Sequence, residues 1–112
     1  DRVISRRRAG FDASAMERVR ALASMVEHCY ARTEDFTACD VALEVPEAAR
    51  AGLAWGRGDD QVSVEASAVA TYTVGAPSRT GARFTLSRDA RGREQRTCTP
   101  AGTGGCRPDG TW

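Results

Sequence analysis

The 112-residue sequence contains one histidine, His28, and this scarcity restricts the enzyme chemistry that it can support. Hydrolytic catalysis usually needs a nucleophile, a base and an orienting acid, and His28 is the one imidazole available as the base. On a helix, its neighbour Cys29 would point about 100° away from it, so the two side chains form a poor catalytic pair. The adjacent Asp59 and Asp60 lie in a glycine-flanked turn, without the apolar pocket that acid–base catalysis by paired carboxylates requires. We predict that the protein is not an enzyme.

The sequence also has no long apolar run and no surplus of charge. It contains neither a membrane-spanning segment nor the apolar core of a signal peptide. Its 16 basic and 15 acidic side chains nearly cancel, whereas proteins dedicated to nucleic acids or anionic membranes carry a clear basic surplus. The glycine-rich segment GTGGC lacks the lysine and the following helix of a phosphate-binding loop. We therefore expect no cofactor, and we interpret the three arginines at 6–8 as a solvated helix face.

The four cysteines fall into two pairs that are local in the sequence, Cys29 with Cys39 and Cys98 with Cys106. Four cysteines permit three pairings, and we favour the local ones because each closes a short loop between or beyond the regular elements. Each closure would contribute about 2.5–3 kcal/mol. A zinc site is a weaker interpretation, since zinc ligands usually come from C-x2-4-C knuckles and the gaps here are nine and seven residues. Unpaired buried thiols are a third interpretation.

Two disulfides would place the protein in an oxidising compartment. Export to such a compartment needs a signal, and none is present in the sequence. We therefore expect that a leader was removed or that an export signal is encoded upstream of Asp1.

Apolar residues recur every three or four positions up to about residue 32, and this spacing predicts an amphipathic helix over residues 1–32. A capping box formed by Ser14 and Glu17 offers a later start, but Gly10 costs only about 1 kcal/mol inside a helix, and we prefer the longer helix. The stripe has no converging polar side chains, so it is more typical of a core than of a cofactor site. Its members are Val3, Ile4, Phe11, Ala15, Met16, Val19, Leu22, Ala23, Val26, Cys29 and Tyr30.

Residues 33–60 break this periodicity and predict a connector. Pro46 opens a short helical turn in PEAARAGL, and a glycine-rich GRGDD follows it. Leu53 and Trp55 are the expected apolar anchors. The tripeptide 57–59 spells the adhesion sequence of integrin ligands, but three residues match by chance so often that we interpret it as an ordinary turn.

From Gln61 the apolar residues alternate with polar ones, which predicts strands in QVSVEA, TYTVGA, ARFTLSR and GREQRTC. The turns at 78–81 and 89–92 each end in glycine, as short hairpins need. We expect a single α+β domain in which the helix covers an antiparallel meander of three to four strands over residues 61–98, with a disulfide-bracketed tail over 98–112.

This order of features resembles the periplasmic portion of a bacterial type IV pilin across essentially all 112 residues. The most specific parts are FTLSRDARG leading into TCTPAGTGGC, and the closing GTW. The resemblance implies a structural subunit of an extracellular filament, in which the N-terminal helix packs inside and the sheet faces outward. It also implies that the Cys98–Cys106 bridge pins a glycine-rich tail that would otherwise fray.

The resemblance also implies partners and residue roles. The partners are other copies of the chain, the pilus assembly machinery, and a membrane contacted only through an N-terminal segment or a separate chain. The strongly hydrophobic half-helix of the family is absent from this sequence, which fits truncation, a naturally split pilin or a secreted relative that does not polymerise. Contacts between subunits are expected from Val3, Ile4, Phe11 and Ala15, and helix–sheet packing from Met16, Val19, Leu22 and Val26.

A binding module is the alternative function. Six arginines within eighteen residues would form a stripe for DNA or for surfaces, or would simply solubilise the sheet and pair with Asp89 and Glu94. They are Arg79, Arg83, Arg88, Arg91, Arg93 and Arg96. A secretion pseudopilin is a further alternative, but such proteins often use a calcium site or a shorter loop where this chain has Cys98 and Cys106.

Overall fold

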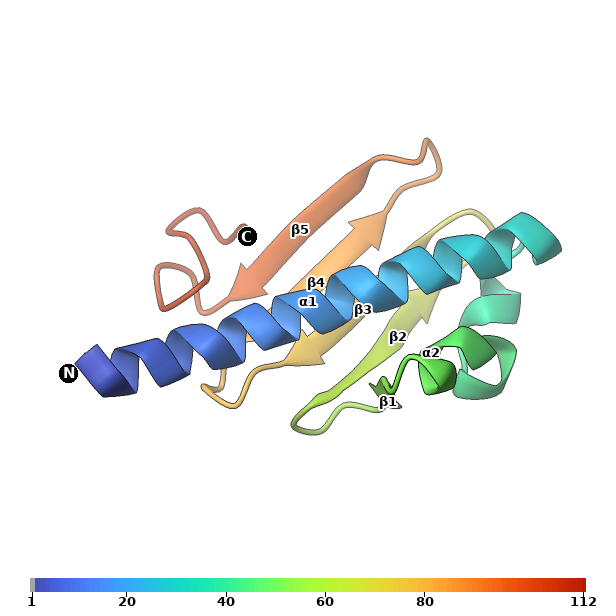
Figure 1. The fold of residues 1–112 in the computed structure, drawn as a ribbon. Coiled ribbons are helices and arrows are strands. Elements are labelled where there is room, and N and C mark those ends of the chain that lie inside the picture. The colour runs from blue at the N-terminus through green and yellow to red at the C-terminus, as the bar shows by residue number, and fades with distance from the viewer. Residues whose placement is uncertain (1) are drawn as a thin grey trace.

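A single long helix crosses one face of a five-stranded sheet (Figure 1). The computed structural model describes residues 2–112, and it describes their side chains from Arg6 onward. Helix α1 (Arg2–Thr33) is uninterrupted, so the longer of the two expected helices is the correct one. Ser14 lies exposed in its middle and caps nothing. At Gly10 an added methyl group would meet no atom, so the glycine is tolerated there without any packing requirement.

The sheet has the strand order β1-β2-β3-β4-β5. The strands are β1 (Ala54–Trp55), β2 (Gln61–Ser67), β3 (Tyr72–Pro77), β4 (Arg83–Arg88) and β5 (Glu94–Thr99). Strands β2 to β5 form the predicted antiparallel meander. The prediction of three to four strands is wrong, because β1 adds a fifth strand that pairs parallel to β2 and makes the sheet mixed.

Strand β1 lies in the segment that we assigned to the connector, and a tight turn brings it beside β2. The backbone of Gly56 has a φ of +155°, and a side chain at this position would collide with that of Gln61. The Gln61 side-chain oxygen accepts a hydrogen bond of 2.7 Å from the Gly58 N–H. Two residues are too few to show an alternation of buried and exposed side chains, so periodicity does not reveal this strand.

The two predicted hairpin turns are present. The Ser78 N–H donates to the Ala82 carbonyl at 2.8 Å, and the Asp89 N–H donates to the Arg93 carbonyl at 3.0 Å. Gly81 and Gly92 adopt φ values of +90° and +80°, which residues other than glycine rarely adopt. Glycine therefore permits the tight turn in both hairpins.

The core lies between α1 and the sheet. Val19, Leu22 and Val26 are almost completely buried, in one cluster with Phe84 and Leu86 of β4. Burial of each side chain of this kind contributes about 1.5–3 kcal/mol. The opposite face of the sheet is polar, and there the hydroxyls of β4 and β5 hydrogen-bond across the strands.

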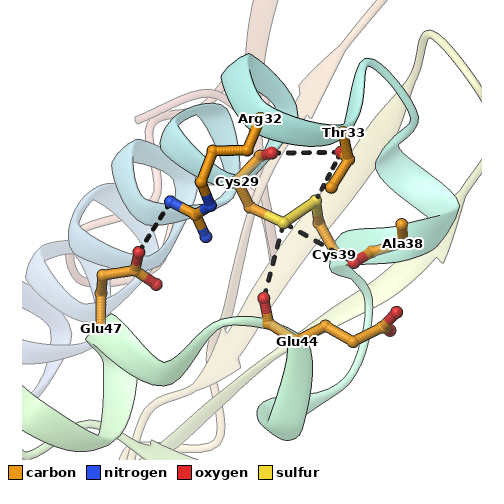
Figure 2. Close-up of polar contacts among 7 residues, drawn as sticks. All are labelled: Cys29, Arg32, Thr33, Ala38, Cys39, Glu44 and Glu47. Atoms are coloured by element: carbon orange, nitrogen blue, oxygen red, sulfur yellow. Dashed lines mark hydrogen bonds and ion pairs between the residues drawn. A yellow bond between two sulfur atoms is a disulfide. The ribbon is translucent and has the colours of Figure 1, made fainter.

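The connector folds back against the end of α1 through short helical turns, η1 (Phe36–Cys39), η2 (Ala42–Glu44) and α2 (Pro46–Arg50). The predicted Cys29–Cys39 disulfide is formed, and Figure 2 shows it between α1 and η1. Phe36 stacks on Tyr30 with ring centroids 4.1 Å apart. The Arg32 guanidinium donates to Glu47 at 2.9 Å. Covalent, aromatic and ionic contacts therefore fix the connector in place.

The C-terminal segment returns to β5 after the second predicted disulfide, Cys98–Cys106. The Cys98 N–H donates to the Gly110 carbonyl at 2.9 Å. The Trp112 indole N–H donates to the Thr85 carbonyl at 2.9 Å, and its ring packs edge-on against Phe84. Over residues 2–112, no helix has the length and apolar character needed to cross a membrane.

Candidate functional site

Asp12 is a buried carboxylate within the apolar stripe of α1, with 2% of its surface exposed. One oxygen accepts hydrogen bonds from the hydroxyls of Ser78 at 2.6 Å and Thr80 at 2.7 Å. The other oxygen accepts from the Gly105 N–H at 2.9 Å. Asp12 therefore joins α1 to two loops, the β3–β4 hairpin and the Cys98–Cys106 loop.

The glycines of the Cys98–Cys106 loop permit its close approach to α1. A Cβ at Gly104 would lie 2.6 Å from a carboxylate oxygen of Asp12, and a Cβ at Gly105 would lie 2.7 Å from the Met16 methyl carbon. Carbon atoms do not approach other heavy atoms this closely without repulsion. The high glycine content of the loop thus has a packing reason, because residues without a Cβ let the loop backbone contact the helix.

A groove of about 570 Å³ opens beside this junction, and we call it the N-terminal groove. Its walls come from α1, from the β3–β4 hairpin and from the Cys98–Cys106 loop. Ala9, Ala13 and Met16 provide an apolar lining on the helix side. Arg8 lies at the boundary with a smaller hollow that Arg79 also lines. The groove thus combines apolar walls with a basic rim.

The lining of the N-terminal groove is largely apolar. Its one carboxylate, Asp12, already accepts three hydrogen bonds. Within residues 2–112, no group of three or more His, Cys, Asp or Glu side chains is close enough to hold a metal ion.

The residues assigned to filament contacts lie in different environments. Val3 and Ile4 lie outside the residues whose side chains the structure describes. Phe11 is half-buried, and its ring centroid lies 5.4 Å from the guanidinium carbon of Arg79. Ala15 is fully buried in the core of the molecule itself, because the helix–sheet contact already includes the residue that directly precedes Met16. Phe11 is therefore the one described member of the set that is accessible at the surface.

Among the residues assigned to the helix–sheet contact, Met16 differs from the other three. Val19, Leu22 and Val26 are buried in the core. Met16 packs against the edge of the core and also lines the N-terminal groove.

The six arginines do not form one stripe. Arg83 projects from the polar face of the sheet, pairs with Glu65, and has a pKa lowered by burial. Arg88 and Arg96 lie on the helix side of the sheet, where Arg88 covers the Phe36 ring at 4.8 Å and Arg96 covers the Trp112 ring at 5.0 Å.

The other three arginines lie in the hairpin turns. Arg79 pairs with Asp60 and lowers the pKa of that carboxyl by hydrogen bonding. Arg91 and Arg93 are exposed in the β4–β5 hairpin, and Arg93 pairs with Asp89 at 3.4 Å. The Arg93 side chain exposes 70% of its surface, compared with 51% for Arg79.

Sequence reasoning missed Asp12, Ser78 and Thr80, although one signal was present. Asp12 lies three residues before Ala15 and four before Met16, which places an acidic residue in the apolar stripe. A carboxylate at such a position is expected to have buried hydrogen-bond partners. The identity of those partners could not be read from the sequence, because they lie 66 to 93 positions away.

Comparison of the chain with protein-family models, with curated proteins and with solved structures finds no match. Its function is therefore inferred from the geometry and from the sequence pattern.

Proposed function

We propose that the protein is a structural subunit, a major or minor pilin, of a bacterial type IV pilus. One observation carries the proposal: α1 is a continuous rod whose residues 6–10 are all exposed, whereas from Asp12 onward one face of it is buried against the β-meander. In Figure 1 the N-terminal end of α1 extends past the strands. A helix that continues beyond its own core is suited to packing against other helices in a filament interior.

The C-terminal segment supports the same proposal. Its glycine-rich loop is pinned by the Cys98–Cys106 disulfide and by the hydrogen bond of Gly105 to Asp12. Such anchoring suits a loop that is exposed on the outside of a filament. Subunits assembled in this way support adhesion, motility or DNA uptake. Polymerisation also needs the assembly machinery and an apolar N-terminal helix, supplied by the same chain or by a partner.

The proposal is tested on the native protein sheared from the surface of the producing cells. We expect the protein to sediment with filaments and to have an intact mass above 12.0 kDa, with a hydrophobic extension before Asp1 and a methylated first residue. N-terminal sequencing and intact-mass measurement check both points. A native protein that starts at Asp1, stays in the supernatant and has no small hydrophobic partner would contradict the proposal.

A DNA-binding or surface-binding module is the second candidate, favoured by the exposure of Arg91 and Arg93. Arg93 pairs with Asp89, and the other four arginines are engaged with acidic or aromatic side chains, so we expect no measurable binding of duplex DNA even at low salt. A salt titration of fluorescent duplex binding checks this. Affinity that falls steeply with salt, and is lost in Arg91→Ala/Arg93→Ala, would favour the binding module instead.

A further inference from the structure

The connector carries two exposed apolar side chains, Val41 and Leu43, which we call the apolar tip. These side chains expose 49% and 93% of their surface. The chain beneath them is fixed by the Cys29–Cys39 disulfide, and the Glu44 carbonyl oxygen lies 3.5 Å from the Cys29 sulfur (Figure 2). One exposed leucine is ordinary on a protein surface. Two apolar side chains held out by a cross-linked loop form a preformed contact surface.

The N-terminal groove lies at the opposite end of the molecule. The connector packs at the C-terminal end of α1, whereas the loops that line the groove lie toward its N-terminal end (Figure 1). The molecule extends 48 Å along its longest axis. The apolar tip is therefore remote from the groove of its own chain, and only a second molecule can bring the two together. The groove volume of about 570 Å³ is ample for two aliphatic side chains.

The charges around the two surfaces are complementary. Residues 34–47 contain five acidic residues and no basic one, whereas residues 6–8 are three consecutive arginines. In the part of the chain with described side chains, neither Glu44 beside the tip nor Arg7 and Arg8 beside the groove forms an ion pair. These charges are free to meet an oppositely charged surface.

We infer that the apolar tip of one copy docks in the N-terminal groove of a second copy. The acidic connector then lies against the basic end of α1 of the second copy. Because the two surfaces differ, the contact is heterologous, and a docked pair retains one free groove, on the first copy, and one free tip, on the second. Repetition of the contact builds an open chain. The inference rests on the proposed function, since it supplies a head-to-tail contact between filament subunits.

Two variants, each defective in one surface, test the contact in the 112-residue chain. Leu43→Asp places a charge in the tip in place of its most exposed apolar side chain and keeps the groove, while Ala13→Trp fills the groove and keeps the tip. Both positions are exposed, so both variants should fold. We expect each variant alone to stay monomeric at concentrations where the parent chain self-associates. An equimolar mixture should form a one-to-one dimer, measured by sedimentation velocity.

Labelling one variant at a time with ¹⁵N locates the contact by NMR. In labelled Leu43→Asp, addition of unlabelled Ala13→Trp should shift the amide signals of Thr80, Gly81 and Gly105 at the groove. In labelled Ala13→Trp, the reverse addition should shift residues 41–44. Ser14→Trp is the matched control, because it places the same aromatic group on the next exposed position of α1, outside the groove. It should associate like the parent chain, and added salt should weaken both associations.

Other outcomes overturn the inference. A mixture that gives no dimer and no shifts shows that the tip does not enter the groove. Shifts confined to another surface indicate a different contact or a different partner for the groove. The filament proposal fails separately, through the mass and sedimentation of the native protein. If the native protein is filamentous but the shifts are absent, the proposed function stands and this contact is refuted. If the shifts are present but the native protein is not filamentous, the contact stands and the proposed function is refuted.

Discussion

Asp12 holds three separate segments at one point, and its hydrogen bonds replace the water that a carboxylate normally binds. The hydroxyls of Ser78 and Thr80 and the N–H of Gly105 all point to it. Removal of one partner from a buried set of this kind leaves the others unsatisfied, which costs more than the net value of each bond.

Asp12→Ala should lower the free energy of unfolding by about 2–3 kcal/mol, because the buried Ser78 hydroxyl and the half-buried Gly105 N–H lose their acceptor. Urea denaturation followed by circular dichroism measures the change. Glu17→Ala is the matched control, since Glu17 is an exposed acid on the same helix in a surface ion pair with Arg20, worth about 0.2–1 kcal/mol. Equal effects of the two substitutions would show that the Asp12 junction does not stabilise the fold.

Asp89 is predicted to titrate below its ordinary range. Backbone N–H groups of Arg93 and Arg91 donate to its carboxylate at 2.9 Å, and these hydrogen bonds lower its pKa. A group with a depressed pKa in the folded state stabilises the fold above its unfolded pKa, and this contribution is lost as the pH falls through the folded value. We expect the contribution to be complete above about pH 4 and to decline below it. NMR titration of the carboxyl carbon checks the pKa, and Asp89→Asn should reduce the acid dependence of unfolding.

At the scale of elements, the contact between α1 and the sheet supplies the core. Val26 lies in its centre with 1% of its surface exposed. Val26→Asp should leave the domain unfolded or greatly destabilised, because the carboxylate would be buried without a partner. Thermal unfolding followed by circular dichroism measures this. Ser24→Asp, on the exposed side of the same helix, should change the melting temperature little; a Val26→Asp protein with the parent melting temperature would refute the burial.

The Cys98–Cys106 loop combines a covalent and a hydrogen-bonded anchor. Replacing both cysteines by alanine should accelerate hydrogen exchange at the Gly105 N–H, because loss of the closure of this short loop costs about 2.5 kcal/mol. Exchange at the Leu86 N–H, in the middle of β4, serves as the internal control for a global change. Unchanged protection of the Gly105 N–H would show that its hydrogen bond to Asp12 is sufficient to hold the loop without the disulfide.

The elements that the sequence could reveal are those with many repeats of one period. Helix α1 spans 32 residues, and strands β2 to β5 are each six or seven residues long with Gly81 and Gly92 in the turns of two hairpins. Strand β1 has two residues and depends on pairing with β2. The Asp12 junction escaped prediction for a related reason, since its contacts join residues distant in the sequence. Local pattern identifies elements, and only the assembled chain identifies which loops meet.

At the scale of the whole molecule, charge and apolar surface are distributed unevenly along its length. The net charge of +1 conceals a basic run at residues 6–8 and an acidic connector at residues 34–47. These regions lie toward opposite ends of α1, beside the N-terminal groove and the apolar tip respectively (Figure 1). In a head-to-tail row, the basic run of one copy would lie beside the acidic connector of the next.

The hydrogen bond between Asp12 and Gly105 joins residues that are 93 positions apart, so it closes a very long loop of the chain. Contacts of such separation form late, because the entropy of closing a long loop must be overcome first. The N-terminal groove cannot be complete before residue 105 has been synthesised, because its walls come from α1 and from the Cys98–Cys106 loop. A partly synthesised chain without the Cys98–Cys106 loop therefore lacks the surface that the proposed contact requires.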